Sequence, residues 1–422
     1  GLGPRINVIM QTAFFKISDI IPLDQALREI KDAIDKSYAK AGQKVLEMNK
    51  QAVDQALEHV YEVAVPERAD SALTMKIGLS GNLPEFVGKT VGTITAGLGD
   101  TLPVSAMPCD GTFPTGTAKY EKRNIAINIP VWDKELCIQC GICSFVCPHA
   151  TIRMKIVEEG ALKGAPATFK SVDAKGKDMD GKKFVLQIAP EDCTGCAACV
   201  YNCPAKSREE ANHRAINMAE QFPLREAEAK NWDFFLGLPE TDSALINRAS
   251  LKGSQLLYPM FEFSGACAGC GETPFLKLIS QLFGDRMYIA NATGCSSIYG
   301  GNLPTTPWSP RSDGRGPTWS NSLFEDNAEF GFGMRLTVDK FSEYARELLV
   351  RIKNCGCSAC GTDPGLFDAL LGADQSTQEA IEAQREGVAK LKKILTGCTD
   401  PGARQLVSVA DYLVKKSVWS IG

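Results

Sequence analysis

Apolar residues recur at helical spacing near the start of the chain. Between residues 22 and 37 they stand three or four positions apart, as one face of an α-helix requires: Leu23, Leu27, Ile30 and Ile34. A second helical series follows Asn49. The preceding stretch RINVIMQTAFF is apolar without this spacing, and we expect a strand or a buried segment there. Residues 1–75 are therefore predicted to combine helices with a strand or buried segment.

The pattern changes twice further along the chain. Residues 76–116 are rich in Gly and Pro, which predicts a linker or small domain. Within residues 117–240, the stretches IRMKIVEE and KKFVLQIAP predict strands on either side of a Gly- and Lys-rich excursion. Residues 241–422 have an α/β pattern, with a helix around PFLKLISQLFG, a strand at MYIANATG, an amphipathic helix over 376–396 and a final strand SVWSIG. We thus expect a multidomain chain, α+β and then α/β.

Composition and charge exclude several classes of protein. The net charge of -4 and the lack of a basic run argue against a nucleic-acid partner. No stretch reaches the roughly 18 uncharged apolar residues of a spanning helix, so we expect a cytoplasmic protein and no membrane contact. The start GLGPRINVIM does not resemble a signal peptide and does not begin with an initiator methionine. We therefore expect the chain to begin inside a longer protein.

Cysteine is the strongest chemical signal, with sixteen residues against three histidines. Two runs have the form C-x2-C-x2-C-x3-C-P, the spacing of bacterial ferredoxins. Three closely spaced thiolates can bind one iron–sulfur cluster, while the fourth reaches the other cluster. We therefore predict two [4Fe-4S] clusters, the first held by Cys137, Cys140, Cys143 and Cys203 and the second by Cys193, Cys196, Cys199 and Cys147.

Zinc knuckles are the plainer alternative for these runs, but zinc does not require four cysteines and a terminal Pro in each. The spacers suit clusters. Gly141 and Gly195 allow tight turns, and apolar spacers can keep water from the sulfurs: Ile138, Ile142, Phe145, Val146 and Val200. His149 is interpreted as a surface or outer-shell residue and not as a ligand. Cys109 is interpreted as structural.

A third, incomplete motif lies in SGACAGCGETPF, where Cys267 and Cys270 precede Glu272. Cys295 follows in the loop NATGCSS after a predicted strand. These cysteines could equally be three unrelated buried thiols, because free cysteine is often buried. Glu272 could equally be an acid at a helix N-terminus, where it favours the helix dipole.

The sequence here resembles a known family, the pyruvate:ferredoxin oxidoreductases. GACAGCGETPFLKLISQLFGDRMYIANATGCSSIYGGNLPTTPWS is similar to their thiamine-diphosphate domain, and RINVIMQTAFFKISDIIPLDQALREIKDAI to the segment before their ferredoxin domain. GRGPTWSNSLFEDNAEFGFGMRL and ADQSTQEAIEAQR match as well. The resemblance covers nearly the whole chain, as a fragment that ends within the thiamine-diphosphate domain.

The resemblance implies several sites. Cys267, Cys270 and Cys295 would bind a third [4Fe-4S] cluster. The fourth ligand of this cluster and the ligands of Mg²⁺ would lie beyond Gly422. Glu272 and Cys295 would lie beside thiamine diphosphate. Residues 1–75 would be the C-terminal part of an α/β domain that binds coenzyme A, and Asn7 and Asn49 fall where the family has asparagines that contact coenzyme A. Other cysteines fall outside the family's motif: Cys355, Cys357, Cys360 and Cys398.

The resemblance also implies a function: oxidative decarboxylation of pyruvate with coenzyme A to acetyl-CoA and CO2, with electrons passing through three clusters to ferredoxin or flavodoxin. The longer protein would be a homodimer, and the fragment alone inactive. A non-catalytic iron–sulfur subunit and an enzyme for another oxoacid are the alternatives. Four lysines near the clusters, which could steer an acidic partner or merely line a solvated loop, are Lys175, Lys177, Lys182 and Lys183.

Overall fold

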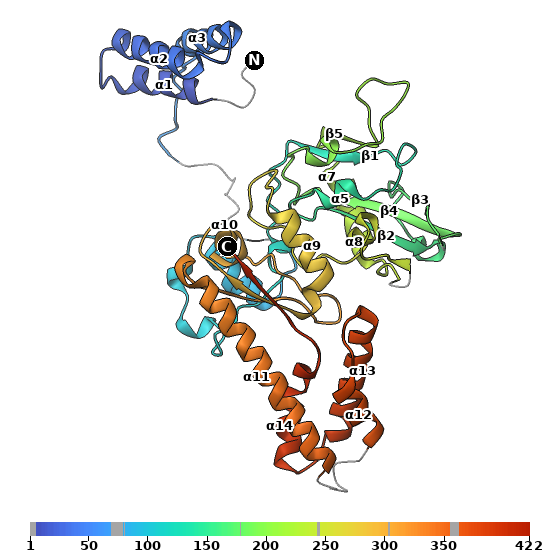
Figure 1. Cartoon of the computed structure of the whole chain (residues 1–422). Helices are drawn as coiled ribbons and strands as arrows, with labels where there is room; N and C mark the ends of the chain where they lie inside the picture. The colour runs from blue at the N-terminus through green and yellow to red at the C-terminus, as the bar shows by residue number, and fades with distance from the viewer. Residues whose placement is uncertain are drawn as a thin grey trace. The chain divides into compact units, whose positions relative to one another are not determined.

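The computed structural model describes residues 6–68, 79, 81–177, 179–242, 245–302, 304–354 and 363–422 (Figure 1). The chain forms two compact units, Gly1–Lys76 and Ile77–Gly422. Among the helices of the described residues, none has the length and apolar character needed to cross a lipid bilayer.

The first unit consists of helices α1 (Asn7–Ser18), α2 (Leu23–Tyr38) and α3 (Gln43–Glu58). Their shared core contains Val8, Ile30, Ile34 and Val53. The prediction of a strand or buried segment at RINVIMQTAFF was wrong, because α1 is a helix that buries little beyond Val8 and Thr12. Its large apolar residues lie all around the helix, so apolar periodicity could not reveal it.

The second unit begins with short helical turns, among them a π-helical turn Val87–Val91 that continues into α4 (Gly92–Thr95). The segment Gly116–Ala118 then pairs with the later segment Thr306–Trp308. The amide of Gly116 donates to the carbonyl of Trp308 at 2.6 Å, and the amides of Thr117 and Ala118 donate to Thr306. This early segment is thereby joined to the α/β part of the same unit.

Residues 128–237 contain the two four-cysteine runs, supported by two small antiparallel sheets. One sheet pairs β1 (Asn128–Trp132) with β5 (Ile216–Glu220). The other has the order β2-β4-β3, formed by β2 (Ile152–Glu158), β4 (Lys182–Ile188) and β3 (Val172–Asp173). Helices α5 (Ile142–Phe145) and α6 (Ala198–Tyr201) follow the cysteine loops, and α7 (Arg225–Gly237) packs against β4. The strands predicted at IRMKIVEE and KKFVLQIAP are confirmed.

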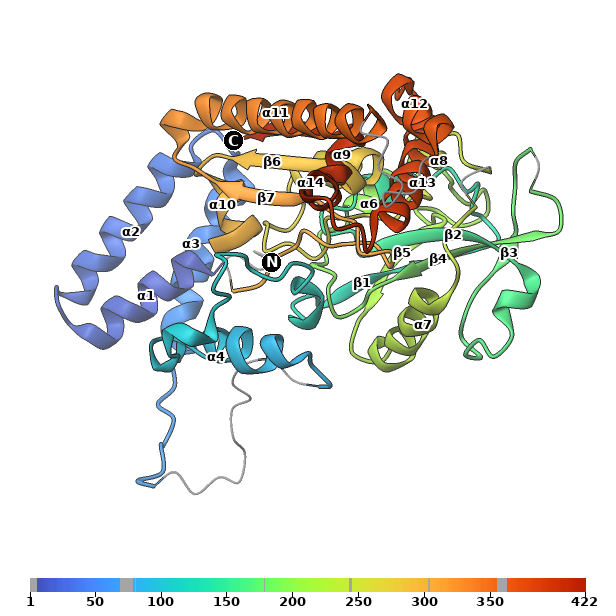
Figure 2. The same cartoon turned by 90° about the horizontal axis from the view of Figure 1, so that it is seen from below.

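The remaining part has a parallel sheet of order β7-β6-β8, formed by β7 (Thr318–Asn321), β6 (Met287–Asn291) and β8 (Ser417–Ile421). Helices α8 (Leu251–Gln255) and α9 (Thr273–Phe283) precede β6, and α10 (Cys295–Ser297) follows it. Figure 2 shows α11 (Asn327–Asn354) running along this sheet. The predicted strands MYIANATG and SVWSIG are confirmed as β6 and β8.

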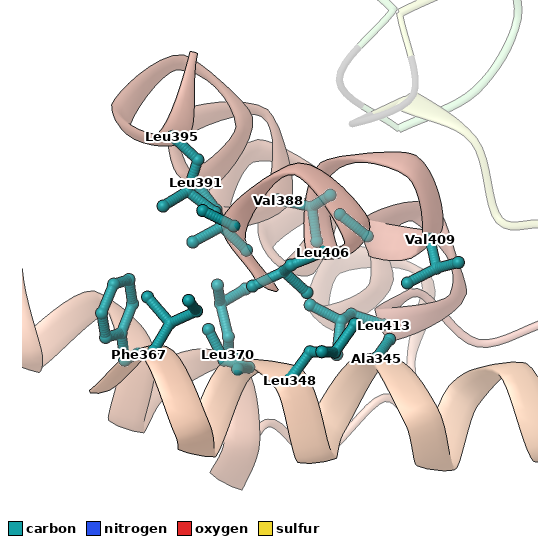
Figure 3. Close-up of a cluster of buried hydrophobic side chains, with 14 of the residues drawn as sticks. Ala345, Leu348, Phe367, Leu370, Val388, Leu391, Leu395, Leu406, Val409 and Leu413 are labelled. Carbon is teal, nitrogen blue, oxygen red and sulfur yellow. The ribbon is translucent and has the colours of Figure 1, made fainter. Parts of the chain in front are cut away.

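A separate hydrophobic core is formed between β7 and β8 in the sequence by α11, α12 (Pro364–Gly372), α13 (Gln378–Leu395) and α14 (Pro401–Val409). Figure 3 shows its side chains meeting from all of these helices. Leu391 and Leu406 are fully buried in it. The amphipathic helix predicted over 376–396 is α13, whose buried positions recur at helical spacing.

Substitution of Leu391 tests this core. Leu391→Ala should destabilise the packing of α11–α14 by about 2–5 kcal/mol, because it removes a fully buried side chain and leaves a cavity. Hydrogen exchange of peptides from these helices should become at least about tenfold faster. Val350→Ala, at a 42% exposed position of α11, is the matched control and should leave the exchange unchanged. Equal exchange in the two variants would contradict the assignment of this core.

Candidate iron–sulfur and cofactor sites

The two cysteine runs fold into loops of the same shape. In each run the second and fourth residues after the first cysteine have positive φ: Gln139 and Gly141 in the first, Gly195 and Ala197 in the second. In each run a backbone amide approaches the first sulfur at 3.4 Å, from Gln139 to Cys137 and from Gly195 to Cys193. The tight turns predicted at Gly141 and Gly195 are confirmed. The left-handed backbone at Gln139 and Ala197 was not predicted, because neither residue type favours positive φ.

Four cysteines line the first hollow, and they come from both runs. Cys203, the last cysteine of the second run, lies with the first three cysteines of the first run. The same neighbours act on one another electrostatically, since the charges that raise the pKa of Cys143 include those of Cys137, Cys140 and Cys203. The structure therefore brings together the set Cys137, Cys140, Cys143 and Cys203.

The second hollow repeats the arrangement with the runs exchanged. Cys147, the last cysteine of the first run, lies with the first three of the second run. Each fourth cysteine follows a one-turn helix, α5 or α6, and these two helices pack together. That packing carries each fourth cysteine across to the other loop. The second set that the structure brings together is Cys147, Cys193, Cys196 and Cys199.

Burial makes these thiols poor acids on their own. It raises the pKa of Cys193 to about 12 and is the largest cause of the raised pKa of Cys199 and Cys143. Thiolates so buried need a cationic centre to hold them ionised. Within the described residues, no three His, Cys, Asp or Glu side chains are close enough to hold a single metal ion.

Trp132 gives the first hollow a further polar group. Its side chain lines the hollow beside Cys137 and is 3% exposed, yet its indole nitrogen has no hydrogen-bond partner among the atoms of the described residues. Burial raises the pKa of Cys137. An unsatisfied buried donor beside Cys137 fits an iron–sulfur cluster, whose sulfurs accept such bonds. Ile138, expected to shield the sulfurs, is instead 54% exposed.

The third group of residues lies at the carboxyl end of β6. Tyr299 donates a hydrogen bond to Glu272 at 2.7 Å. Burial and Glu272 raise the pKa of Tyr299, and the charges of Cys270 and Cys295 act on it as well. Glu272 directly precedes α9, and its hydrogen bond with Tyr299 places it in the same group of residues as Cys270 and Cys295. Cys267 and Cys295 are exposed and Cys270 is half-buried, so the alternative of three buried thiols is wrong.

The third group is in contact with the second hollow. Gly269, between Cys267 and Cys270, has φ +74°, and a Cβ there would lie 3.7 Å from the Cβ of Cys196. His149, which lines the second hollow, has its Nδ1 3.1 Å from the carbonyl oxygen of Ser264. His149 is 2% exposed, so the surface position was wrong, while a place in the outer shell of the second hollow agrees with the prediction. The residue is buried because it fills the space between the two sites.

Other predicted residues lie elsewhere. Asn7 is exposed at the start of α1, while Asn49 is buried and donates to Val45 within its own helix at 2.8 Å. Both belong to the first unit. Cys109 is exposed, and Cys398 is buried in the core of α11–α14. Three further cysteines lie outside the described residues: Cys355, Cys357 and Cys360.

Two of the four lysines expected near the clusters have acidic partners. Lys182 pairs with Glu158, and Lys183 pairs with Asp173 at 2.8 Å. Their charges are thereby largely balanced at the start of β4. Lys175 contacts the first cysteine loop directly, since its Nζ lies 3.3 Å from the carbonyl oxygen of Cys137.

Two exchanged sets of four cysteines beside a parallel α/β sheet define the chain as an iron–sulfur redox protein. A family model described as a 4Fe-4S dicluster domain matches residues 136–207. A second model, the EKR domain of unknown function, matches residues 73–126.

The whole chain is similar to pyruvate oxidoreductases. It is 54% identical to the pyruvate-flavodoxin oxidoreductase of Nostoc sp. and 46% identical to the pyruvate:ferredoxin oxidoreductase of Moorella thermoacetica, covering 100% of this chain and 36% of each relative. It is 41% identical to the mitochondrial pyruvate dehydrogenase [NADP(+)] of Euglena gracilis, over 100% of this chain and 23% of the relative. The resemblance to the pyruvate:ferredoxin oxidoreductases is confirmed, and the chain spans about a third of the length of the first two relatives.

Exchange of the fourth cysteines predicts the effect of substituting them. Cys203→Ala should remove the cluster of the first hollow and leave that of the second, a loss of about four iron atoms. Cys147→Ala should do the reverse. Iron content and the EPR spectrum of each reduced, anaerobically reconstituted variant would report this. Cys109→Ala, at an exposed position, is the control. Loss of the cluster bound by each cysteine's own run would contradict the exchange.

Proposed function

We propose that this chain is the electron-transfer and partial cofactor-binding part of an enzyme that oxidises pyruvate with coenzyme A to acetyl-CoA and CO2. The observation that carries the proposal is similarity over the whole chain to pyruvate oxidoreductases, joined to two hollows of four cysteines each. The electron acceptor is ferredoxin or flavodoxin, as the names of the relatives indicate. The longer protein acts as a homodimer.

Three [4Fe-4S] clusters serve as the electron path in this proposal. Two occupy the four-cysteine hollows. The third is bound by Cys267, Cys270 and Cys295, together with a ligand from the rest of the longer protein. Contact between Gly269 and Cys196 supports an electron path from the third site to the second hollow, because electron transfer between clusters requires close approach.

Thiamine diphosphate with Mg²⁺ is the organic cofactor in this proposal, and it supplies the stabilised carbanion that oxoacid decarboxylation requires. The carboxyl ends of β6, β7 and β8 form one edge of a parallel sheet, the usual ligand-binding edge of such folds. Cys295 follows β6 at that edge. Oε1 of Glu272 accepts the hydrogen bond from Tyr299, which leaves Oε2 to bind and orient the cofactor.

Coenzyme A contacts are assigned to Asn7 and Asn49. The exposed amide of Asn7 is accessible to a ligand. The amide nitrogen of Asn49 is engaged within its helix, so its oxygen is the group left for a ligand. Of the two residues, Asn7 is the better supported.

The longer protein tests the proposal directly. It should reduce ferredoxin or flavodoxin only when both pyruvate and coenzyme A are present, measured anaerobically with each substrate omitted in turn. The 422-residue chain alone should hold clusters and be inactive in this assay. Turnover of 2-oxoglutarate in place of pyruvate would identify an enzyme for another oxoacid. Reduction of the clusters without any oxoacid turnover would identify a non-catalytic electron carrier.

Glu272 is the residue whose substitution should matter most in the third group. In the longer protein, Glu272→Gln should lower kcat by about 100-fold or more if its carboxylate orients the cofactor and relays its proton. Tyr299→Phe removes one hydrogen bond to Glu272 and should have a smaller effect, of about tenfold. Glu379→Gln, on the exposed start of α13, is the control. Unchanged kcat in Glu272→Gln would refute the assigned role.

A further inference from the structure

Lys277 is a fully buried cation that the sites described above do not use. It lies in the middle of α9, in the apolar run PFLKLISQLF, and is 1% exposed. Its ammonium group donates to three backbone carbonyls of the first cysteine run, those of Ser144, Phe145 and Cys147, the last two at 3.1 and 3.4 Å. A helix of the α/β part is thereby attached to the turn that leaves the first cluster loop.

Among the ion pairs of the described residues, none includes Lys277. The charged groups that act on it are Arg153, which repels it, and the two cysteines Cys147 and Cys143. A buried ammonium without a nearby anion is costly, and hydrogen bonds to neutral carbonyls offset only part of that cost. Negative charge at Cys143 and Cys147 would therefore stabilise the buried ammonium group.

The two cysteines belong to different hollows. Cys143 lines the first and Cys147 the second. α5, whose last carbonyls Lys277 binds, contains Cys143 and leads to Cys147. The cation is thus placed where it acts on both hollows at once.

We propose that Lys277 is a positioning residue that raises the reduction potentials of both ferredoxin-type clusters, an inference that rests on the proposed function. Each cluster gains one electron on reduction and becomes more negative. A positive charge that acts on a cysteine of each hollow stabilises that state in both. The anionic clusters in turn supply the counter-charge that the buried ammonium lacks.

Redox titration of the 422-residue chain, reconstituted anaerobically and followed by EPR, tests the proposal. In Lys277→Met, the ratio of reduced to oxidised cluster at a fixed potential should fall by about tenfold for both clusters, a shift of about 59 mV to more negative potential. Lys277→Gln, which keeps donors for the carbonyls but no charge, should shift in the same direction. Lys277→Arg should stay close to the unsubstituted chain.

Lys155→Met is the matched control. Lys155 is also a buried lysine, 5% exposed, that donates to backbone carbonyls, here of Phe235 and Leu238. It has its own partner, Glu240, at 2.8 Å, and the charges that act on it are those of Glu240 and Arg153. Its substitution should leave both potentials unchanged.

Each outcome decides between charge and packing. Unchanged potentials in Lys277→Met and Lys277→Gln, or an equal shift in Lys155→Met, would overturn the proposal. Loss of iron from the Met and Gln variants but not from Lys277→Arg would support it, since charge is what these variants lack. Loss from all three would overturn it in favour of packing. An unsubstituted chain without any [4Fe-4S] signal would instead count against the proposed function itself.

Discussion

The exchange of the fourth cysteine between the two runs is the constraint on which the rest of this unit depends. One cysteine run cannot complete either hollow by itself. Cys147 of the first run lies in the second hollow, and Cys203 of the second run lies in the first. The two loops, the helices α5 and α6, and the supporting sheets must therefore be positioned together. Burial raises the pKa of Cys143 and of Cys199, so a thiolate in either hollow is unfavourable without a cationic partner. Cluster binding and the folding of this region are thus expected to be coupled.

The α/β part is joined to this centre through specific contacts and not through general packing alone. Gly269 lies against Cys196, and the ring of His149 fills the space toward Ser264. Lys277 reaches from α9 to the carbonyls that follow Cys143. α9 begins directly after Glu272, so one short helix links the third group of residues to the first cluster loop. Precise spacing of redox centres requires a rigid connection of this kind.

Much of this could be predicted from the sequence, because the cysteine spacing is itself a geometric rule. Strands with clear alternation and the amphipathic α13 were also predicted. The strand or buried segment expected at α1 was wrong, since apolar residues on every side of a helix remove the periodic signal. Tyr299 and Lys277 were missed because their partners are distant in the sequence. Trp132 lies close to Cys137 in the sequence, but no motif marked it as a residue of the hollow. A lone lysine within the apolar run of α9 was the one available signal for Lys277.

The helices α11–α14 lie between β7 and β8 in the sequence, and this has a consequence for how the chain is made. β7 is synthesised shortly after its neighbour β6, but the other neighbour, β8, follows only after the whole helical segment. One edge of β6 therefore stays open during synthesis, with its amides and carbonyls unpaired. Rapid local folding of the helices shortens the effective loop that must close, so they act as a kinetic aid to completion of the sheet.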